Sequence, residues 1–538
     1  SIAVVGGATF LVSNLIGLKQ DNAKRLLGYS SIGQMGLLTL ALAATAQLGV
    51  EAPLALIVGG LFINHLLAKA GLFWLADLVN HKTTRDWSVL AGRPLLLVVF
   101  GILLAALVGL PPFPGFWAKW LLMMELATGG LYGWIAVVLL GSLLEAAYLF
   151  RWFTQALQAR KTDAPERISR WKLAPVAVTT ILLFASGYAM AVQLESDTLA
   201  MFLPLLAGAV LWLLDGLLPG RLKSLLMLLM VAAGGAWLTL DLEGLNRIFG
   251  FILVAGGVLV SLATQYRGDA RKGFYPLLAI LLLSLATLLR AHTSLAFFFS
   301  WELMTLSSYL LITLGRNGVK PSLTYLLFSL AAAYCILAGF ALAYAATGSI
   351  ELAALGGTGD TVDLVFSLLA AGFIIKTGAL GVHIWVPGAY GEADDDFSAL
   401  LSAVVSKAAI FGLLLVAAQL GVRSDIGLDP AYVLGWIGML TATFGALMAV
   451  FQEDVKRLLA YSSMGQLGYI VTGIALMSHL GWVAALYLTV NHFLFKGILF
   501  LAIAGVIVRT NERLMYKMGG LIKNMPFTFV ATMIAIIA

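Results

Sequence analysis

The stretch KRLLGYSSIGQMG at Lys24–Gly36 returns almost unchanged as KRLLAYSSMGQLG at Lys456–Gly468. A second shared phrase follows each copy, NHLLAKAGLF at Asn64–Phe73 and NHFLFKGILF at Asn491–Phe500. Two phrases repeated in the same order predict two homologous units in tandem. Both copies place a His and a Lys inside apolar sequence, and a charge buried in a membrane indicates function by default.

The composition is that of a membrane protein. Of the 538 residues, 61% are hydrophobic and 11% are charged, with a mean hydropathy of +0.97. A soluble domain carries about 25% charged residues. The net charge of +6 comes from basic residues in short loops between apolar runs, so it does not indicate a nucleic-acid partner.

Apolar runs of bilayer length recur along almost the whole chain, which predicts an all-α, polytopic transmembrane bundle of about sixteen complete spans and two partial ones. The partial spans are expected at 1–18 and from 526. The complete spans are expected at 24–47, 53–80, 94–128, 134–156, 173–195, 201–219, 224–240, 246–264, 274–290, 293–314, 321–345, 361–386, 398–420, 430–452, 456–478 and 483–508. Because the sequence begins and ends inside apolar runs, we expect it to be part of a longer polypeptide.

The loops alternate in charge along the chain. The basic set includes Lys24 and Arg25, Lys82 and Arg85, Arg221 and Lys223, Arg316 and Lys320, and Lys456 and Arg457. The other loops, among them 47–53, 128–133 and 477–481, contain almost no Lys or Arg. The positive-inside rule places the basic loops in the cytoplasm. We therefore expect a multi-pass protein of a bacterial-type inner membrane.

Two of the expected spans are interrupted. GLPPFPGF at 109–116 breaks the 94–128 span, because proline lacks a backbone donor and clashes with the preceding turn. VPGAYG at 386–391 is expected to end or break the 361–386 span. Broken helices at membrane depth need protein or water around the freed backbone groups, and they mark ion paths in many transporters. The alternative is a proline kink that only shapes packing.

Titratable side chains inside the spans are the candidate functional residues: Glu302, Lys376, Lys407, His383, His492, Lys496, Lys119, His65 and Lys69. Each central charge costs ~2.5–3.5 kcal/mol on insertion scales. The pairs His65/Lys69 and His492/Lys496 have helical i, i+4 spacing, and His383 is expected to share a helix face with Lys376. Glu125 and Glu145 have no clear partner in the sequence and are expected to serve packing or a secondary relay.

Some of these titratable residues also have a purely structural explanation. A lysine near a helix end can extend its ammonium to the interface, which applies to Lys407, Lys69 and Lys496. A single His on an apolar face, such as His383, is commonly a packed core residue. For the full set, alternating Lys, His and Glu form a chain of groups that can load and release protons.

The sequence contains no motif that binds a cofactor or a metal. Cys335 is the only cysteine, which excludes a disulfide framework and a cysteine-ligated cluster. The sequence has no CxxCH, HExxH, GxGxxG or Walker A motif, and nothing in it has the oxygen-rich pattern of a sodium cage. We therefore expect no cofactor, no metal and no catalytic residue in this chain, and any redox chemistry or ATP hydrolysis in a partner.

Six phrases carry a family resemblance: Phe297–Ile312, Lys376–Tyr390, Ser398–Leu414, Phe451–Tyr469, Asn491–Phe500 and Gly109–Trp120. They resemble the antiporter-like membrane subunits of respiratory complex I, of Mrp-type cation/proton antiporters and of energy-converting membrane hydrogenases. By that resemblance, residues 1–198 correspond to helices 9–14 of a first unit. Residues 199–538 then correspond to helices 1–11 and the start of helix 12 of a second unit.

The resemblance also implies roles for the buried charges. Glu302 on helix 5 and Lys376 on helix 7 are the input pair, and Lys407 on helix 8 is the central relay. Lys119, on the broken helix 12 of the first unit, is the output lysine. His492 and Lys496 fall on helix 11. One departure is the acidic run Glu392, Asp394, Asp395 and Asp396, for which we expect a solvated loop or, alternatively, a proton-collecting or docking surface.

The sequence thus predicts proton translocation by a Glu/Lys/His relay in the membrane arm of a larger, redox-driven complex. The expected partners are the lipid bilayer and other membrane subunits, with a peripheral redox subunit. Three alternatives remain. They are an Mrp-type cation/proton antiporter, a module that energises a soluble partner such as a carbonic-anhydrase-like protein in bicarbonate uptake, and a scaffold without transport.

Overall fold

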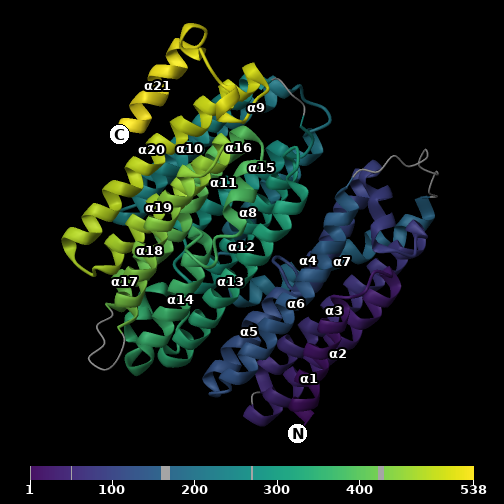
Figure 1. The fold of residues 1–538 in the computed structure, drawn as a ribbon. Helices are drawn as coiled ribbons and strands as arrows, with labels where there is room; N and C mark the ends of the chain where they lie inside the picture. The colour runs from purple at the N-terminus through teal and green to yellow at the C-terminus, as the bar shows by residue number, and fades with distance from the viewer. Residues whose placement is uncertain (1, 50, 159–169, 268–270, 422–428) are drawn as a thin grey trace. The chain divides into compact units, whose positions relative to one another are not determined.

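The computed structural model describes residues 2–49, 51–158, 170–267, 271–421 and 429–538. Over these residues the chain is helical, and its β-structure consists of isolated bridges (Figure 1). Ten of the described helices are long and apolar enough to cross a membrane, and several shorter apolar helices accompany them. The protein is therefore a multi-pass integral membrane protein, and each predicted span has a helical counterpart.

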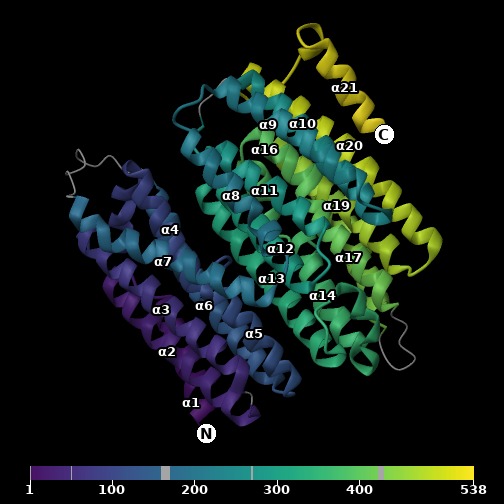
Figure 2. The ribbon, with the colours of Figure 1, turned by 180° about the vertical axis from the view of Figure 1, so that it is seen from behind.

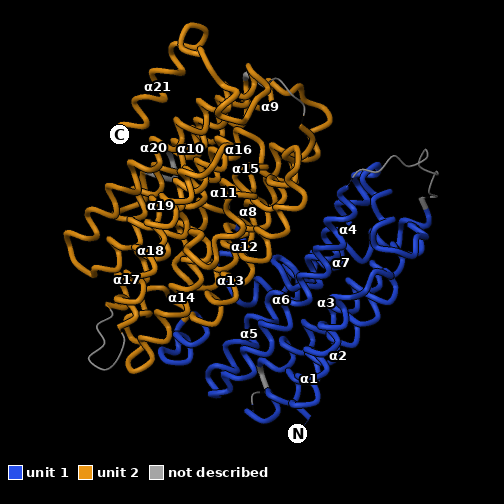
Figure 3. Tube along the Cα trace, viewed as in Figure 1, with its two compact units in different colours: residues 1–199, 340–349 blue, residues 200–339, 350–538 orange. Residues whose placement is uncertain are grey.

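The chain forms two compact units (Figure 3). Unit 1 comprises residues 1–199 and 340–349, and unit 2 comprises residues 200–339 and 350–538. The helices of residues 1–199 are α1 (Ile2–Gly17), α2 (Ala23–Leu48), α3 (Glu51–Val79), η1 (Thr84–Gly92), α4 (Pro94–Val108), α5 (Pro114–Thr128), α6 (Tyr132–Leu157) and α7 (Arg170–Leu194).

The remaining helices follow in chain order, and α9 and α10 pack side by side within unit 2 (Figure 2). The first are α8 (Thr198–Leu214), α9 (Gly220–Leu240), α10 (Gly244–Arg267), α11 (Phe274–Leu289), α12 (Ser294–Thr313), α13 (Val319–Thr347), η2 (Leu352–Gly357), η3 (Gly359–Thr361) and α14 (Val362–Thr377). The rest are α15 (Trp385–Glu392), α16 (Asp395–Leu400), η4 (Leu401–Val405), α17 (Ser406–Leu420), α18 (Pro430–Val450), α19 (Val455–Ala475), α20 (His479–Thr510), η5 (Met515–Lys517), η6 (Leu521–Lys523) and α21 (Pro526–Ile537).

The repeated phrase folds in the same way in both places. The side chain of Asn22 caps α2 by accepting from the Arg25 N–H, and Asp454 caps α19 by accepting from the first N–H groups of that helix. Each cap residue also forms a β-bridge to the segment after the next long helix, Asn22 with Thr83 and Asp454 with Leu514. Side-chain caps and bridges at equivalent positions support the interpretation of two homologous copies.

A broken helix follows the bridge in unit 1, as predicted. The helix α4 ends at Val108 and α5 begins at Pro114, with Gly109 in the left-handed region at φ +82°. Proline at the first position of α5 loses no hydrogen bond there. The break at 109–113 therefore follows from the Gly and Pro residues of the sequence.

The break in the other interrupted span was placed wrongly from the sequence. The helix α14 ends at Thr377, the segment 378–384 is non-helical, and Val386–Gly391 lies inside α15. Gly378 and Gly381 have φ of +75° and +92°, conformations that glycine adopts without strain. Pro387 lies in the first turn of α15, where proline is tolerated. The glycines, and not the proline, interrupt this span.

Small residues let neighbouring helices approach at backbone distance. A Cβ atom added at Gly36 of α2 would lie 2.6 Å from the Phe10 nitrogen of α1, and one at Gly468 of α19 would lie 2.5 Å from the Ala442 nitrogen of α18. Each glycine is the last residue of its copy of the repeated phrase. Close packing through glycine is a common way to join helices in lipid, where no hydrophobic effect drives helices together.

We predict that Gly36→Ala destabilises unit 1 by about 1–3 kcal/mol, because overpacking forces α1 and α2 apart. The matched control is Gly28→Ala in the same helix, where an added Cβ meets nothing within 4 Å. Thermal unfolding of the detergent-solubilised protein measures both. Equal melting temperatures for the two variants would contradict the packing assigned to Gly36.

Candidate functional site

Lys376 lies in a buried polar cluster at the end of α14. Its side chain is 2% exposed, and its Nζ donates to Tyr325 Oη at 2.7 Å, Ser329 Oγ at 3.1 Å and Thr305 Oγ1 at 3.2 Å. An ammonium has three N–H donors, and three hydroxyl acceptors match them. Because hydroxyl groups rotate and also donate, the same cluster can hold the lysine as an ammonium or as a neutral amine.

Glu302 supplies a negative charge that acts on this lysine. It is 2% exposed on α12, one turn before Thr305, and acts electrostatically on Lys376. Trp301 places its ring 5.9 Å from the Lys376 Nζ. The structure thus brings the predicted input pair together inside unit 2, within a shell of aromatic and hydroxyl side chains.

Lys407 forms a second buried cluster with α20. Its Nζ is 2.7 Å from the Ser402 carbonyl oxygen, 3.3 Å from Ser406 Oγ and 2.5 Å from His492 Nδ1. The π-helical turn η4 directly precedes Lys407 and alters the backbone pairing around Ser402. Such turns are frequent at functional sites, and here one provides an acceptor for a charge at membrane depth.

Lys496 completes this cluster from one turn further along α20. It is fully buried and lies within electrostatic reach of both Lys407 and His492. Two ammonium groups at this range repel each other, so a proton on one disfavours a proton on the other. The arrangement couples the protonation of Lys407 to that of Lys496.

The lysine of the second repeated phrase makes the same contact in both copies. Lys496 Nζ donates to the Leu459 carbonyl oxygen at 3.2 Å, and Lys69 Nζ donates to the Leu27 carbonyl oxygen at 2.9 Å. Leu459 and Leu27 occupy the same position of the first repeated phrase. The two phrases are therefore joined in space by a lysine-to-carbonyl hydrogen bond.

In unit 1, Lys119 lies on α5 beside the helix break. Its side chain is 7% exposed, and its Nζ donates to the Val108 carbonyl oxygen at 2.6 Å and to Ser142 Oγ at 3.0 Å. Val108 is the last residue of α4, so the broken helix leaves its carbonyl free for the lysine. The predicted output lysine thus binds the end of a half-helix.

Glu145 is a buried charge whose surroundings the sequence did not reveal. It has no exposed surface, and it accepts from Ser30 Oγ at 2.8 Å and from Gln34 Nε2 at 2.6 Å. It also acts electrostatically on Lys119 and Lys69. The only hint in the sequence was that Ser30 and Gln34 both belong to the repeated phrase.

The other two candidate histidines, His65 and His383, lie outside the hydrogen-bonded clusters described above. His65 shares a face of α3 with Lys69, and its Nδ1 has no hydrogen-bond partner among the described residues. The expectation that His383 shares a helix face with Lys376 was wrong, because the helix ends at Thr377. His383 lies in the glycine-containing segment 378–384, where its ring packs 5.0 Å from that of Phe444.

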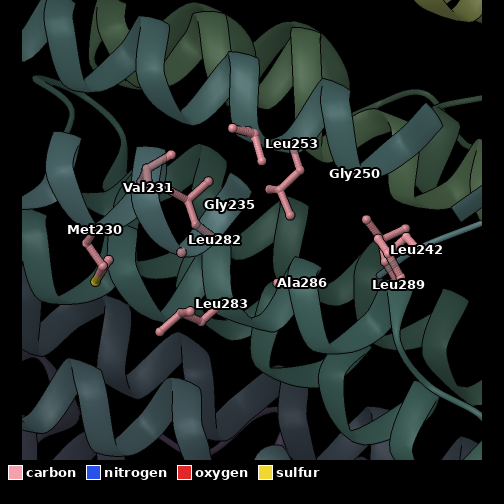
Figure 4. A pocket seen from close by; sticks show the side chains of 12 residues that line it. Met230, Val231, Gly235, Leu242, Gly250, Leu253, Leu282, Leu283, Ala286 and Leu289 are labelled. Carbon is pink, nitrogen blue, oxygen red and sulfur yellow. The ribbon is translucent and has the colours of Figure 1, made fainter. Parts of the chain in front are cut away.

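One apolar cavity of unit 2 lies apart from these clusters. It lies among α9, α10 and α11 (Figure 4). Only apolar side chains and glycines line it: Met230, Val231, Gly234, Gly235, Leu242, Gly250, Leu253, Val254, Leu282, Leu283, Ala286 and Leu289. Such a lining offers no group that binds an ion. Within the described ranges, no three His, Cys, Asp or Glu side chains are grouped so as to hold a metal.

Comparison with known proteins identifies the family. The family described as "NADH:quinone oxidoreductase/Mrp antiporter, TM" matches residues 1–145 and 291–538, which is well over half of the chain. The chain belongs to this family. Both matched regions contain the buried clusters described above.

Curated relatives in the NADH:quinone oxidoreductase/Mrp antiporter family have several activities in their names. Hydrogenase-4 component B of Escherichia coli is 31% identical over 56% of this chain and 48% of its own length. NADH-quinone oxidoreductase subunit N of Desulforudis audaxviator is 34% identical over 44% of this chain and 49% of its own length. The chain thus spans about half the length of each of these two relatives.

Solved structures of the same architecture come from multisubunit complexes. A chain of the Mrp complex from Dietzia sp. aligns with a TM-score of 0.55 and 25% identity, covering 63% of this chain and 70% of that one. A chain of the membrane-bound sulfane sulfur reductase, described as an archaeal respiratory membrane complex, aligns with a TM-score of 0.56 and 27% identity. The alignment covers 64% of this chain and 62% of that one.

In this family member the acidic run 392–396 forms ion pairs, so the expectation of a solvated loop was wrong. Arg271 contacts Asp394 at 2.7 Å and Asp396 at 2.5 Å, and Lys456 contacts Asp395 at 2.9 Å. Burial acts to lower the pKa of Arg271, but its hydrogen bonds and charge interactions with Asp396 and Asp394 raise that pKa above the ordinary value. The run therefore fixes the junction between α15 and α16.

Glu392 extends this network to the segment after α20. It lies 3.3 Å from Arg513, which also contacts Asp454 at 2.8 Å. Asp454 is the cap of α19. The residue that caps the start of α19 and the acidic run thereby contact the same guanidinium group.

We predict that Arg271→Gln destabilises unit 2 by roughly 3–5 kcal/mol, because it removes a cation that contacts the buried Asp396. The variant Asp396→Asn should destabilise as well, and the double variant should lose less than the sum of the two. Denaturation of the purified protein in detergent measures all three. Strictly additive losses would show that Arg271 and Asp396 do not stabilise each other.

Proposed function

We propose that this protein moves protons across the membrane through a relay of buried lysine, histidine and glutamate side chains. The observation that carries the proposal is that buried lysines are hydrogen-bonded to hydroxyls, carbonyls or histidine, with carboxylates within electrostatic reach. Groups of this kind accept both protonation states of a lysine.

In this proposal, the relay first binds a proton at Lys376, beside Glu302. When Glu302 is ionised it stabilises the ammonium form of Lys376, and when its charge is removed the lysine is left among neutral hydroxyls and releases a proton more readily. Tyr325, Ser329 and Thr305 solvate the lysine in either form. The protein thus holds a proton whose binding depends on one neighbouring charge.

The central step takes place at Lys407, His492 and Lys496. His492 Nδ1 accepts from the Lys407 ammonium, or donates to the neutral amine after a change of tautomer. Since Lys496 and Lys407 repel each other when both are charged, arrival of a proton at one promotes departure from the other. This coupling gives the relay an electrostatic means of passing a signal along the chain.

We further propose that the protein works inside a multisubunit, redox-driven membrane complex of a bacterial-type inner membrane. The similarity to subunits of an Mrp complex and of a respiratory sulfur reductase complex supports membrane partners. A peripheral redox subunit would supply the energy. A carbonic-anhydrase-like partner, or cation/proton exchange as in the Mrp complex, is the second possibility within this family.

We predict that Lys376→Ala and Glu302→Gln each abolish coupled proton uptake in sealed membrane vesicles while the complex still assembles. Lys376→Arg should fail too, because arginine keeps the charge but does not release its proton. The controls are Lys320→Ala and Glu243→Gln, two exposed residues of unit 2. Full proton uptake in all three test variants would overturn the relay.

A further inference from the structure

Among the described residues, Glu145 is held by neutral donors and forms no direct ion pair. Its two carboxylate oxygens accept from Ser30 Oγ and Gln34 Nε2, both on α2. Gln34 Nε2 also lies 3.4 Å from the Leu107 carbonyl oxygen of α4. The Ser30 hydroxyl can donate to an ionised carboxylate or accept from a protonated one, so the site fits both forms of Glu145.

Lysines approach Glu145 from two different helices of unit 1. Lys69 comes from α3 and is anchored to the Leu27 carbonyl, one turn before Ser30. Lys119 comes from α5 and contacts Ser142, which lies one turn before Glu145 on α6. Both lysines act electrostatically on the carboxylate. Glu145 is therefore the group common to the two buried lysines.

The second copy of the repeat places other charged groups beside its lysine. Lys496 keeps the same bond to a helix carbonyl as Lys69, and Lys407 and His492 are the charged groups that act with it. In unit 1 the group that acts on Lys69 is Glu145, a carboxylate that can accept the proton of that lysine.

We propose that Glu145 carries protons between Lys69 and Lys119 in unit 1. An N–H bond of the Lys69 ammonium breaks and an O–H bond forms on Glu145, which leaves a neutral amine and a carboxylic acid. That O–H bond then breaks as an N–H bond forms on the Lys119 amine, and the carboxylate returns. The reverse direction uses the same steps backwards, and no oxidant or reductant is needed. This inference rests on the proposed function.

The test uses the full-length protein in its native complex in sealed vesicles. Glu145→Gln keeps the shape and a hydrogen bond from Ser30 but cannot bind a proton, so we expect proton uptake to fall by roughly 100-fold. The control is Asp77→Asn, an exposed carboxylate near the end of α3 in the same unit, which should transport at the wild-type rate.

Two further readouts separate a proton carrier from a structural group. Glu145→Asp restores a carboxylate at a different distance, and it should recover part of the uptake with a displaced pH profile. In infrared difference spectra taken during turnover, one carboxylic acid C=O band should be present in wild type and in Asp77→Asn and should be lost in Glu145→Gln. If Glu145→Gln fails to assemble, the pH profile of Glu145→Asp decides.

The outcomes distinguish this inference from the proposed function. Normal uptake in Glu145→Gln, or an unchanged rate and pH profile in Glu145→Asp, would overturn the role of Glu145 while Glu302→Gln still blocked transport. No proton uptake by the wild-type complex under any energisation would instead overturn the proposed function.

Discussion

The cost of placing a charged amine inside a bilayer governs this structure. Each such charge costs about 2.5–3.5 kcal/mol even by insertion scales, so every buried ammonium needs acceptors. The chain provides them partly by interrupting helices and partly with hydroxyl groups. Lys119 binds the carbonyl at the end of α4, Lys407 binds a carbonyl in a π-helical turn, and Lys376 donates to three side-chain hydroxyls. The irregular backbone and the buried charges are thus parts of one arrangement.

The repeat shows how one scaffold accepts different charges. The phrase pairs on α2/α3 and on α19/α20 share caps, bridges and a lysine bound to a helix carbonyl. In the first pair the lysine is near Glu145, and in the second it is near Lys407 and His492. Among the described residues, the two phrase pairs therefore share the lysine-to-carbonyl contact and differ in the charged groups that act on the lysine.

The sequence predicted the helices better than the contacts between them. Apolar length located the spans, and the prolines of 109–116 located one break. The other break was misplaced because the glycines 378 and 381, and not Pro387, set the backbone there. The partners of Glu145 and of the acidic run lie more than 50 residues away. Such pairings depend on helix packing, which a local pattern in one sequence does not encode.

The most direct measurement is ion flux through the full-length protein with its native partners in sealed vesicles, recording protons and sodium together, with and without an electron donor. The account predicts proton uptake that requires the donor and proceeds without sodium. Proton movement driven only by an imposed sodium or potassium gradient, with no effect of any donor, would contradict it and would establish a cation/proton antiporter.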